Sequence, residues 1–275
     1  TWSSATTYAL ADKVVYNDKI YESLIASNLN KQPNTNPNDW LDLGASNKTA
    51  MFDIQVNTQT TATTSLTVSL QPGSSFNAVS FLNLIGNTIS ITVKDSPAGS
   101  VVYTETINLD NSTNNVINWY TYFFEDFDIR TEVVFQNIPP YVNGVIDVTI
   151  SAGTGATVAI GTCSVGTMIE LGDTQYGLSY GIRDYSIKET DEFGNTRFIQ
   201  RAFSKRMSPK LMVPNTRLNY IGKTLENLRA TPTVYIAVDD PTYGGTIVFG
   251  FLKDWNIEIN YPQHSMISIE VDGLI

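Results

Sequence analysis

Thr64-Ser-Leu-Thr-Val-Ser-Leu70 alternates apolar and polar residues, and the fold class of this chain follows from that pattern. The same alternation returns in Val145-Ile-Asp-Val-Thr-Ile150. A period of two places successive side chains on opposite faces of a β-strand, so both stretches predict strands with one buried and one solvated face. We therefore expect a mainly β protein.

Further strands are expected wherever residues rich in Val, Ile, Thr, Phe or Tyr are bounded by Gly, Pro, Asn or Asp. Turn-separated strands from about residue 50 to 165 favour an antiparallel two-sheet sandwich of the jelly-roll or immunoglobulin-like sort. The strands expected up to that point are Lys13–Tyr16, Lys19–Ile25, Ser65–Leu70, Ala78–Ile85, Ile89–Lys94, Val101–Leu109, Trp119–Phe124, Glu132–Phe135, Val145–Ser151 and Thr157–Val165.

The last third of the chain combines strands with one helix. Leu218, Ile221, Leu225 and Leu228 recur at helical spacing, which predicts a helix over about residues 216–229. Asn215 or Thr216 can cap its start, and Pro232 lies beyond its end. The strands expected around it are Gly177–Tyr185, Arg197–Phe203, Val234–Val238, Thr246–Leu252, Trp255–Asn260 and Met266–Val271, with a hairpin turn at Thr190–Asn195.

We expect three domains, because 275 residues exceed the usual size of one domain. The predicted divisions are a small β module at 1–46, a β-sandwich at 47–168 and an α+β domain at 169–275. Gly-rich sequence between Gly166 and Gly172 interrupts the strands at the second boundary.

Composition excludes several classes of protein. An apolar content of 42% with 16% charged residues indicates an ordered chain with a substantial core. The net charge of −10 leaves no basic stripe for phosphates, so we expect no nucleic-acid binding. Cys163 is the one cysteine and lies in an expected strand, which favours a buried thiol and folding in a reducing cytoplasm. No signal peptide and no apolar run of about 18 residues occurs, so membrane insertion is not expected.

Large aromatic residues are concentrated near the N-terminus, where five lie within the first forty residues. The spacing of the residues in this segment resembles the pattern of small chitin- and cellulose-binding modules. The matching residues are Trp2, Tyr8, Val14, Tyr16, Tyr21 and the closing Asn36-Pro37…Trp40. That family usually has Gly-Asp where this chain has Ala11-Asp12. The resemblance covers about 45 residues and implies a carbohydrate-stacking platform. Its rings would be Trp2, Tyr8, Tyr16, Tyr21 and Trp40. The alternative is that these rings pack together or form a protein interface.

A second resemblance covers most of the chain. The segment after Trp40 contains the motif Asn47-Lys-Thr-Ala-Met-Phe-Asp53. It resembles a motif found at the same place in many virion proteins of tailed phages. Asp184–Gly194, Leu228–Pro232 and the closing Gly273-Leu274 also look like that family. The C-terminal α+β pattern resembles tail-tube and distal-tail proteins. The resemblance implies a structural subunit of a tail tip, baseplate or neck, assembled in the bacterial cytoplasm into a ring with other tail proteins, and contacting host surface glycans.

We expect no enzymatic activity and no cofactor. His264 is the one histidine, so a metal site rich in His is excluded by count. Acidic residues beside aromatic ones leave a polysaccharide-cleaving protein as the alternative. Its candidate acids are Glu125, Asp126 and Asp128 after the aromatic strand, and Asp239 and Asp240 near Tyr243.

The preferred interpretation of the aromatic strand is that Trp119, Tyr122 and Phe124 alternate into a core while the acids face water. Two oxygen-rich stretches, Asp191–Asn195 and Asp110-Asn111, could hold calcium. Neither has the spacing of a helix–loop–helix calcium site, so we expect both to be ordinary turns.

Overall fold

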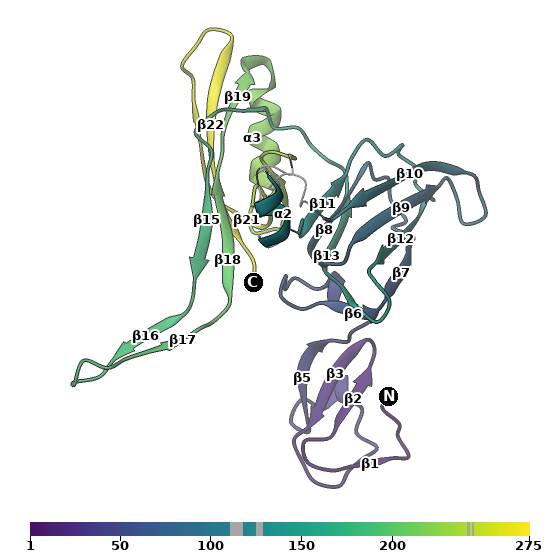
Figure 1. Cartoon of the computed structure of the whole chain (residues 1–275). Helices are drawn as coiled ribbons and strands as arrows, with labels where there is room; N and C mark the ends of the chain where they lie inside the picture. Colours follow the sequence, from purple (N-terminus) through teal and green to yellow (C-terminus); the bar gives the residue numbers. More distant parts are fainter. Residues whose placement is uncertain (111–117, 125–128, 241–242, 244) are drawn as a thin grey trace.

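The computed structural model describes residues 1–110, 118–124, 129–240, 243 and 245–275. The fold is mainly β, with a small N-terminal module, a central antiparallel sandwich and a C-terminal α+β part (Figure 1). The domain limits at 46/47 and 168/169 stay predictions, while the sheets themselves are described below.

The N-terminal module contains two small antiparallel sheets. One pairs β1 with β4, and the other has the order β2-β3-β5. The predicted strands over residues 13–16 and 19–25 are confirmed, the second ending two residues early. The strands are β1 Thr7–Tyr8, β2 Lys13–Tyr16, β3 Lys19–Ser23, β4 Asn28–Leu29 and β5 Trp40–Ala45.

The central part is a sandwich of two four-stranded sheets, with the orders β10-β9-β12-β7 and β11-β8-β13-β6. Phe81, Phe135, Ile91 and Ile150 are among the buried residues between them. Cys163 also faces this core, as expected. The strands are β6 Thr60–Thr63, β7 Ser65–Leu70, β8 Ala78–Ile85, β9 Thr88–Lys94, β10 Val101–Asn108, β11 Glu132–Phe135, β12 Val145–Ser151 and β13 Thr157–Gly166.

The strand predicted at Trp119–Phe124 is wrong, because this segment forms the α-helix α2. Trp119 stacks on Phe123 and Tyr120 lies against Phe124, pairings four residues apart that a helix brings together. The Asn118 side chain accepts a hydrogen bond from the Tyr120 amide at 2.9 Å and so caps the helix. Trp119 and Phe124 are 78% and 74% exposed, so they do not enter a core as predicted. The side chain of Tyr122 lies outside the described residues.

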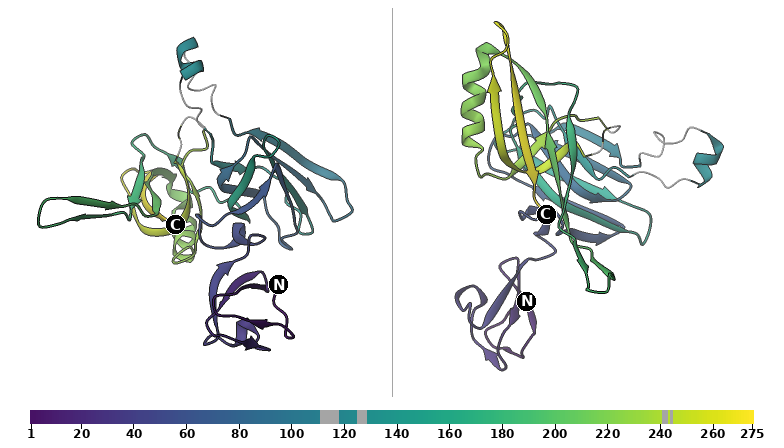
Figure 2. Two further views of the ribbon diagram at one scale, coloured as in Figure 1. Left: turned by 60° about the horizontal axis from the view of Figure 1, so that its bottom comes forward. Right: turned by 90° about the vertical axis from the view of Figure 1, so that its left-hand side faces the viewer.

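The C-terminal sheet has seven strands, covered on one face by helix α3 (Figure 2). Strand β22 is central and pairs with β21 on one side and with β18 and β19 on the other. A separate hairpin, β16–β17, extends beyond the sheet. The strands are β14 Asp173–Thr174, β15 Ser179–Asp184, β16 Ile187–Thr190, β17 Thr196–Ile199, β18 Phe203–Ser208, β19 Lys210–Pro214, β20 Thr233–Ile236, β21 Ile247–Glu258 and β22 His264–Gly273.

The predicted helix is confirmed as α3, Leu218–Asn227, after a 3₁₀ turn at Asn215–Arg217. Ile221 and Leu225 are buried against the sheet, as their spacing predicts. The cap prediction is wrong, since no side chain caps the helix. The Asn215 side-chain Nδ2 instead donates to the carbonyls of Tyr261 and Pro262 at 3.0 Å.

Two predicted strands, Thr246–Leu252 and Trp255–Asn260, are one strand. The residues between them form an irregularity in the pairing of β21 with β22 rather than a turn. Conversely, the single strand predicted over Arg197–Phe203 is split between β17 and β18. Neither difference changes the order of the strands in the sheet.

An apolar contact, here called the seam, joins the sandwich to the C-terminal sheet. Its buried members are Leu82, Val134 and Ile247, and its half-buried members are Val234, Ile236 and Phe249. Two ion pairs cross the same boundary. Lys205 pairs with the buried Glu132, and Arg130 pairs with Asp239 at 3.0 Å. Burial lowers the pKa of Lys205.

The junction between the N-terminal module and the sandwich is also held by polar contacts. The Asn47 side-chain amide donates to the Thr61 carbonyl at 3.0 Å and accepts from the Thr61 amide at 2.9 Å. The Thr49 hydroxyl donates to the Asp18 carbonyl at 2.8 Å. The segment that follows the module is therefore held to β6 by a two-way amide pairing and to the module through Asp18.

Burial should make Cys163 inert in the folded protein. Its environment raises the pKa of the thiol to about 12, because burial disfavours the thiolate. We expect no reaction with a thiol-specific reagent at pH 8 in the native state, and one modified thiol per chain after unfolding in guanidinium chloride. Rapid native labelling that is unaffected by stabilising conditions would contradict a buried thiol.

Candidate functional site

The N-terminal aromatic cluster is the first candidate. Trp2 meets Tyr16 edge to face at a centroid distance of 5.4 Å, and Tyr8 meets Trp40 in the same way at 5.4 Å. Together with Tyr21, these rings form the core of the module. Edge-to-face packing is a favourable arrangement of aromatic rings.

Burial divides the five predicted sugar-binding residues into two groups. Tyr8, Tyr21 and Trp40 are buried, and the Trp40 indole donates to the Lys31 carbonyl at 2.8 Å. A buried ring has no free face for a sugar, so these three stabilise the module. Trp2 and Tyr16 are half-buried and remain the two rings of the cluster that a sugar could reach.

The backbone at Ala11 reflects the difference from the Gly-Asp that chitin- and cellulose-binding modules usually have at this position. Ala11 has a φ of 68°, in the left-handed region where glycine is favoured. Two backbone hydrogen bonds hold it there, from the Ala11 amide to the Ser23 carbonyl and from the Ser23 amide to the Asp12 carbonyl. The turn therefore keeps the conformation that suits glycine while an alanine occupies it.

The second candidate is the pair of open edges of the C-terminal sheet. Within the described residues, β15 pairs with β18 alone. On the opposite side of the sheet, β20 covers β21 only at residues 247–250, which leaves Phe251–Glu258 with one neighbouring strand. Unpaired N–H and C=O groups along such edges can pair with a strand from another chain.

Of the candidate acids, the structure describes Asp239 and Asp240. Asp239 accepts hydrogen bonds from Arg130 and from the Gln136 amide, the latter at 2.7 Å. Both belong to the boundary with the sandwich, so Asp239 has a structural role. Asp240 follows it, and Tyr243 is exposed. Glu125, Asp126 and Asp128 lie outside the described residues.

The oxygen-rich stretch Asp191–Asn195 forms the turn between β16 and β17. The Asp191 carboxylate accepts hydrogen bonds from the backbone amides of Asn195 and Phe193 at 2.7 and 3.0 Å. The Asn195 side chain, also bonded to it, makes the largest contribution to lowering the pKa of Asp191. In the other stretch, Asn111 lies outside the described residues. His264 begins β22 and is half-buried.

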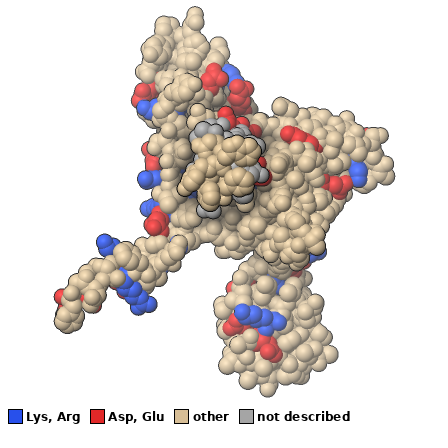
Figure 3. Space-filling view, in the orientation of Figure 1, with Lys and Arg blue, Asp and Glu red and all other residues tan. Residues whose placement is uncertain are grey.

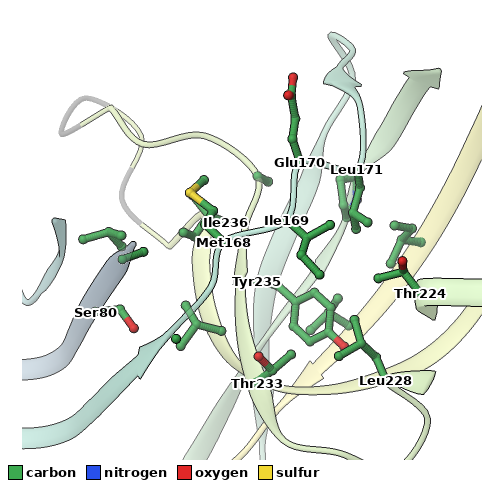
Figure 4. A pocket seen from close by; sticks show the side chains of 18 of the residues that line it. Ser80, Met168, Ile169, Glu170, Leu171, Thr224, Leu228, Thr233, Tyr235 and Ile236 are labelled. Carbon is green, nitrogen blue, oxygen red and sulfur yellow. The ribbon is translucent and has the colours of Figure 1, made fainter. Parts of the chain in front are cut away.

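A cavity of about 310 Å³ lies between the sandwich, residues 167–174 and the C-terminal sheet. Figure 4 shows Ile169, Leu228 and Tyr235 converging on it, while Glu170 points away. Its lining is largely apolar, and no cluster of three potential metal ligands occurs in the part of the chain that the structure describes.

Sequence reasoning missed a third surface, the aromatic face of α2. Trp119, Tyr120, Phe123 and Phe124 are between 68% and 78% exposed. Figure 2 shows α2 projecting from the body of the molecule. Asn118 was the available signal, because an Asn before an aromatic run can cap a helix.

Replacing Ala11 by Gly should stabilise the N-terminal module. Relief of the left-handed strain outweighs the greater unfolded-state entropy of glycine, giving a net gain of about 0.5 kcal/mol. The gain in stability is measured by hydrogen exchange of peptides covering residues 1–45 in the full chain. The control is Ala9→Gly, at an exposed position without a positive φ, where exchange should accelerate. Equal effects of the two variants would contradict this account of the turn.

Comparison of the chain with protein-family models and with curated protein sequences finds no match. Among the described residues, no helix has the length and apolar character needed to cross a bilayer. The open sheet edges and the exposed aromatic surfaces are the features of the chain that bear on its function.

Proposed function

We propose that this chain is a structural subunit of a phage tail tip, baseplate or neck, assembled with other tail proteins in the bacterial cytoplasm. It acts through contact area rather than catalysis. The supporting observation is that one sheet has two open edges, at β15 and at Phe251–Glu258 of β21. If one edge of a subunit pairs with the opposite edge of the next copy, the contact is head to tail. Repeating this contact generates a closed ring when the rotation between neighbouring subunits brings the last copy back to the first.

The charge pattern of the edges is compatible with such pairing. On β21, Asp254 and Glu258 are exposed and form no ion pair with the described residues. On β15, Arg183 is 59% exposed at its side chain and lies 3.5 Å from Asp272. Opposite charges on neighbouring strands are favourable when the strands pair.

In this proposal the N-terminal module is displayed outside the ring. Several copies of a weak binding surface, held in one assembly, bind far more strongly than one copy. Host surface glycans are thus suitable ligands even if the affinity of each module is low. The half-buried Trp2 and Tyr16 are the rings available for that contact.

Assembly is tested by mass photometry of the purified full chain and by mass spectrometry of virions from its source. We expect a discrete ring-sized species and a fixed copy number in particles. A chain that stays monomeric at high concentration and never enters particles would refute this function.

Edge pairing is tested separately by cross-linking introduced cysteines, since the native Cys163 is buried. In the double variant Ser179→Cys/Asn256→Cys, one cysteine stands on each open edge. A short bismaleimide should then link neighbouring chains into a ladder of multimers. The matched control is Ser179→Cys/Lys48→Cys, whose second cysteine lies at an exposed position outside the sheet. Equal ladders from both would show that the edges are not specifically apposed.

A carbohydrate-binding protein is the second candidate, favoured by the exposed aromatic rings. Carbohydrate binding is measured as retention of the chain on chitin, peptidoglycan and lipopolysaccharide. Trp2→Ala should reduce retention about fivefold or more if a sugar stacks on this ring as a nucleic-acid base stacks on an aromatic side chain, an interaction worth about 1–3 kcal/mol. Tyr220→Ala, at an exposed ring on α3, is the control and should bind as the unaltered chain does. Absence of binding by the unaltered chain to all three would eliminate this candidate.

A further inference from the structure

The hairpin β16–β17 and its flanking residues form a projecting arm, defined here as residues 185–202. It continues β15 and β18 past the end of the sheet, with Ile187 opposite Ile199 and Thr190 opposite Thr196. Figures 1 and 2 show this arm extending clear of the rest of the chain. Within the part of the chain that the structure describes, no further sheet or helix packs against it.

The arm exposes almost all of its residues. Only Ile187 and Ile199 are half-buried, while Phe193 and Phe198 are 90% and 73% exposed. A two-stranded hairpin alone is marginally stable in water, and most need a third strand or a packed face. Two exposed phenylalanines on such a ribbon are typical of residues that anchor a protein interface.

Two basic residues of the arm indicate the kind of partner. The arm as a whole is neutral, with three basic and three acidic residues, and the longer ribbon of residues 179–208 carries +2 while the rest of the chain carries −12. Figure 3 shows both basic and acidic side chains along this ribbon. Arg197 and Arg201 form no ion pair within the described ranges. Their counter-charges are therefore best supplied by an acidic surface, and the body of this same chain is strongly acidic.

We infer that the arm docks on the body of a second copy of this chain, with Phe193 and Phe198 as apolar anchors and Arg197 and Arg201 facing acidic groups. The open edge of β15 runs directly into the arm, so a neighbour paired along β15 also lies near its base. This inference rests on the proposed ring and adds a second contact between its subunits. Edge pairing sets the position of the neighbouring subunit, and the arm holds that subunit through a second contact, here called the clamp.

The first test removes the arm without disturbing the sheet. Residues 187–199 are replaced by Asn-Gly, a two-residue turn suited to joining the opposed strands at Ser186 and Gln200. Mass photometry across a concentration series gives the dissociation constant of the assembly. We expect it to rise about a hundredfold, equivalent to about 2.7 kcal/mol. Unchanged hydrogen exchange in β18 and β22 would establish that the sheet still folds.

The second test separates charge from shape. Arg197→Glu/Arg201→Glu should weaken assembly about tenfold, and the difference should shrink as salt is added. The matched control, Lys48→Glu/Lys223→Glu, makes the same change in net charge at exposed sites outside the ribbon. It should shift the dissociation constant less than about twofold.

The third test identifies the partner directly. A photo-reactive benzoylphenylalanine at position 193 is introduced into a mixture of ¹⁴N- and ¹⁵N-labelled chains. Cross-linked peptides that combine the two labels support docking on a second copy, while cross-links within one chain overturn it. Assembly of the armless chain at the unaltered affinity also overturns the clamp and leaves the ring intact. A full chain that never associates overturns the ring itself, so the two failures are distinguishable.

Discussion

Packing of the sandwich against the C-terminal sheet, through the seam, sets the positions of the other parts. Leu82 and Val134 belong to one sheet and Ile247 to the other, so strands rather than loops form this contact. The Glu132–Lys205 pair has one partner on each side, with Glu132 buried and Lys205 half-buried. Breaking a buried pair by removing one partner leaves an uncompensated charge, which is costly. The relative orientation of the two sheets therefore depends on both apolar fit and charge pairing.

Local sequence periodicity was sufficient to predict the sandwich and α3. The alternation in Ser65–Leu70 and Val145–Ser151 is confirmed as β7 and β12, and the apolar spacing of Ile221 and Leu225 as the buried face of α3. Helix α2 could not be predicted in the same way, because Trp119–Phe124 is aromatic at five of its six positions. Such a segment has no period, and its cap at Asn118 was the decisive local signal.

The candidate sites were less predictable for a different reason. Whether an aromatic ring is a platform or a core residue depends on contacts between segments far apart in sequence, such as Tyr8 with Trp40. The same holds for Asp239, whose partners Arg130 and Gln136 belong to another part of the chain. Residue type indicates what a group can do chemically, whereas tertiary packing determines whether it is available.

The two-way pairing of Asn47 with Thr61 has a mechanical consequence. A load applied to the N-terminal module reaches β6 within a few residues, with little slack chain to absorb it. Strand β6 lies at the edge of its sheet and is held by pairing with β13. A pull on the module therefore loads β6 through the Asn47–Thr61 pairing, and one short edge strand passes that load to the sandwich.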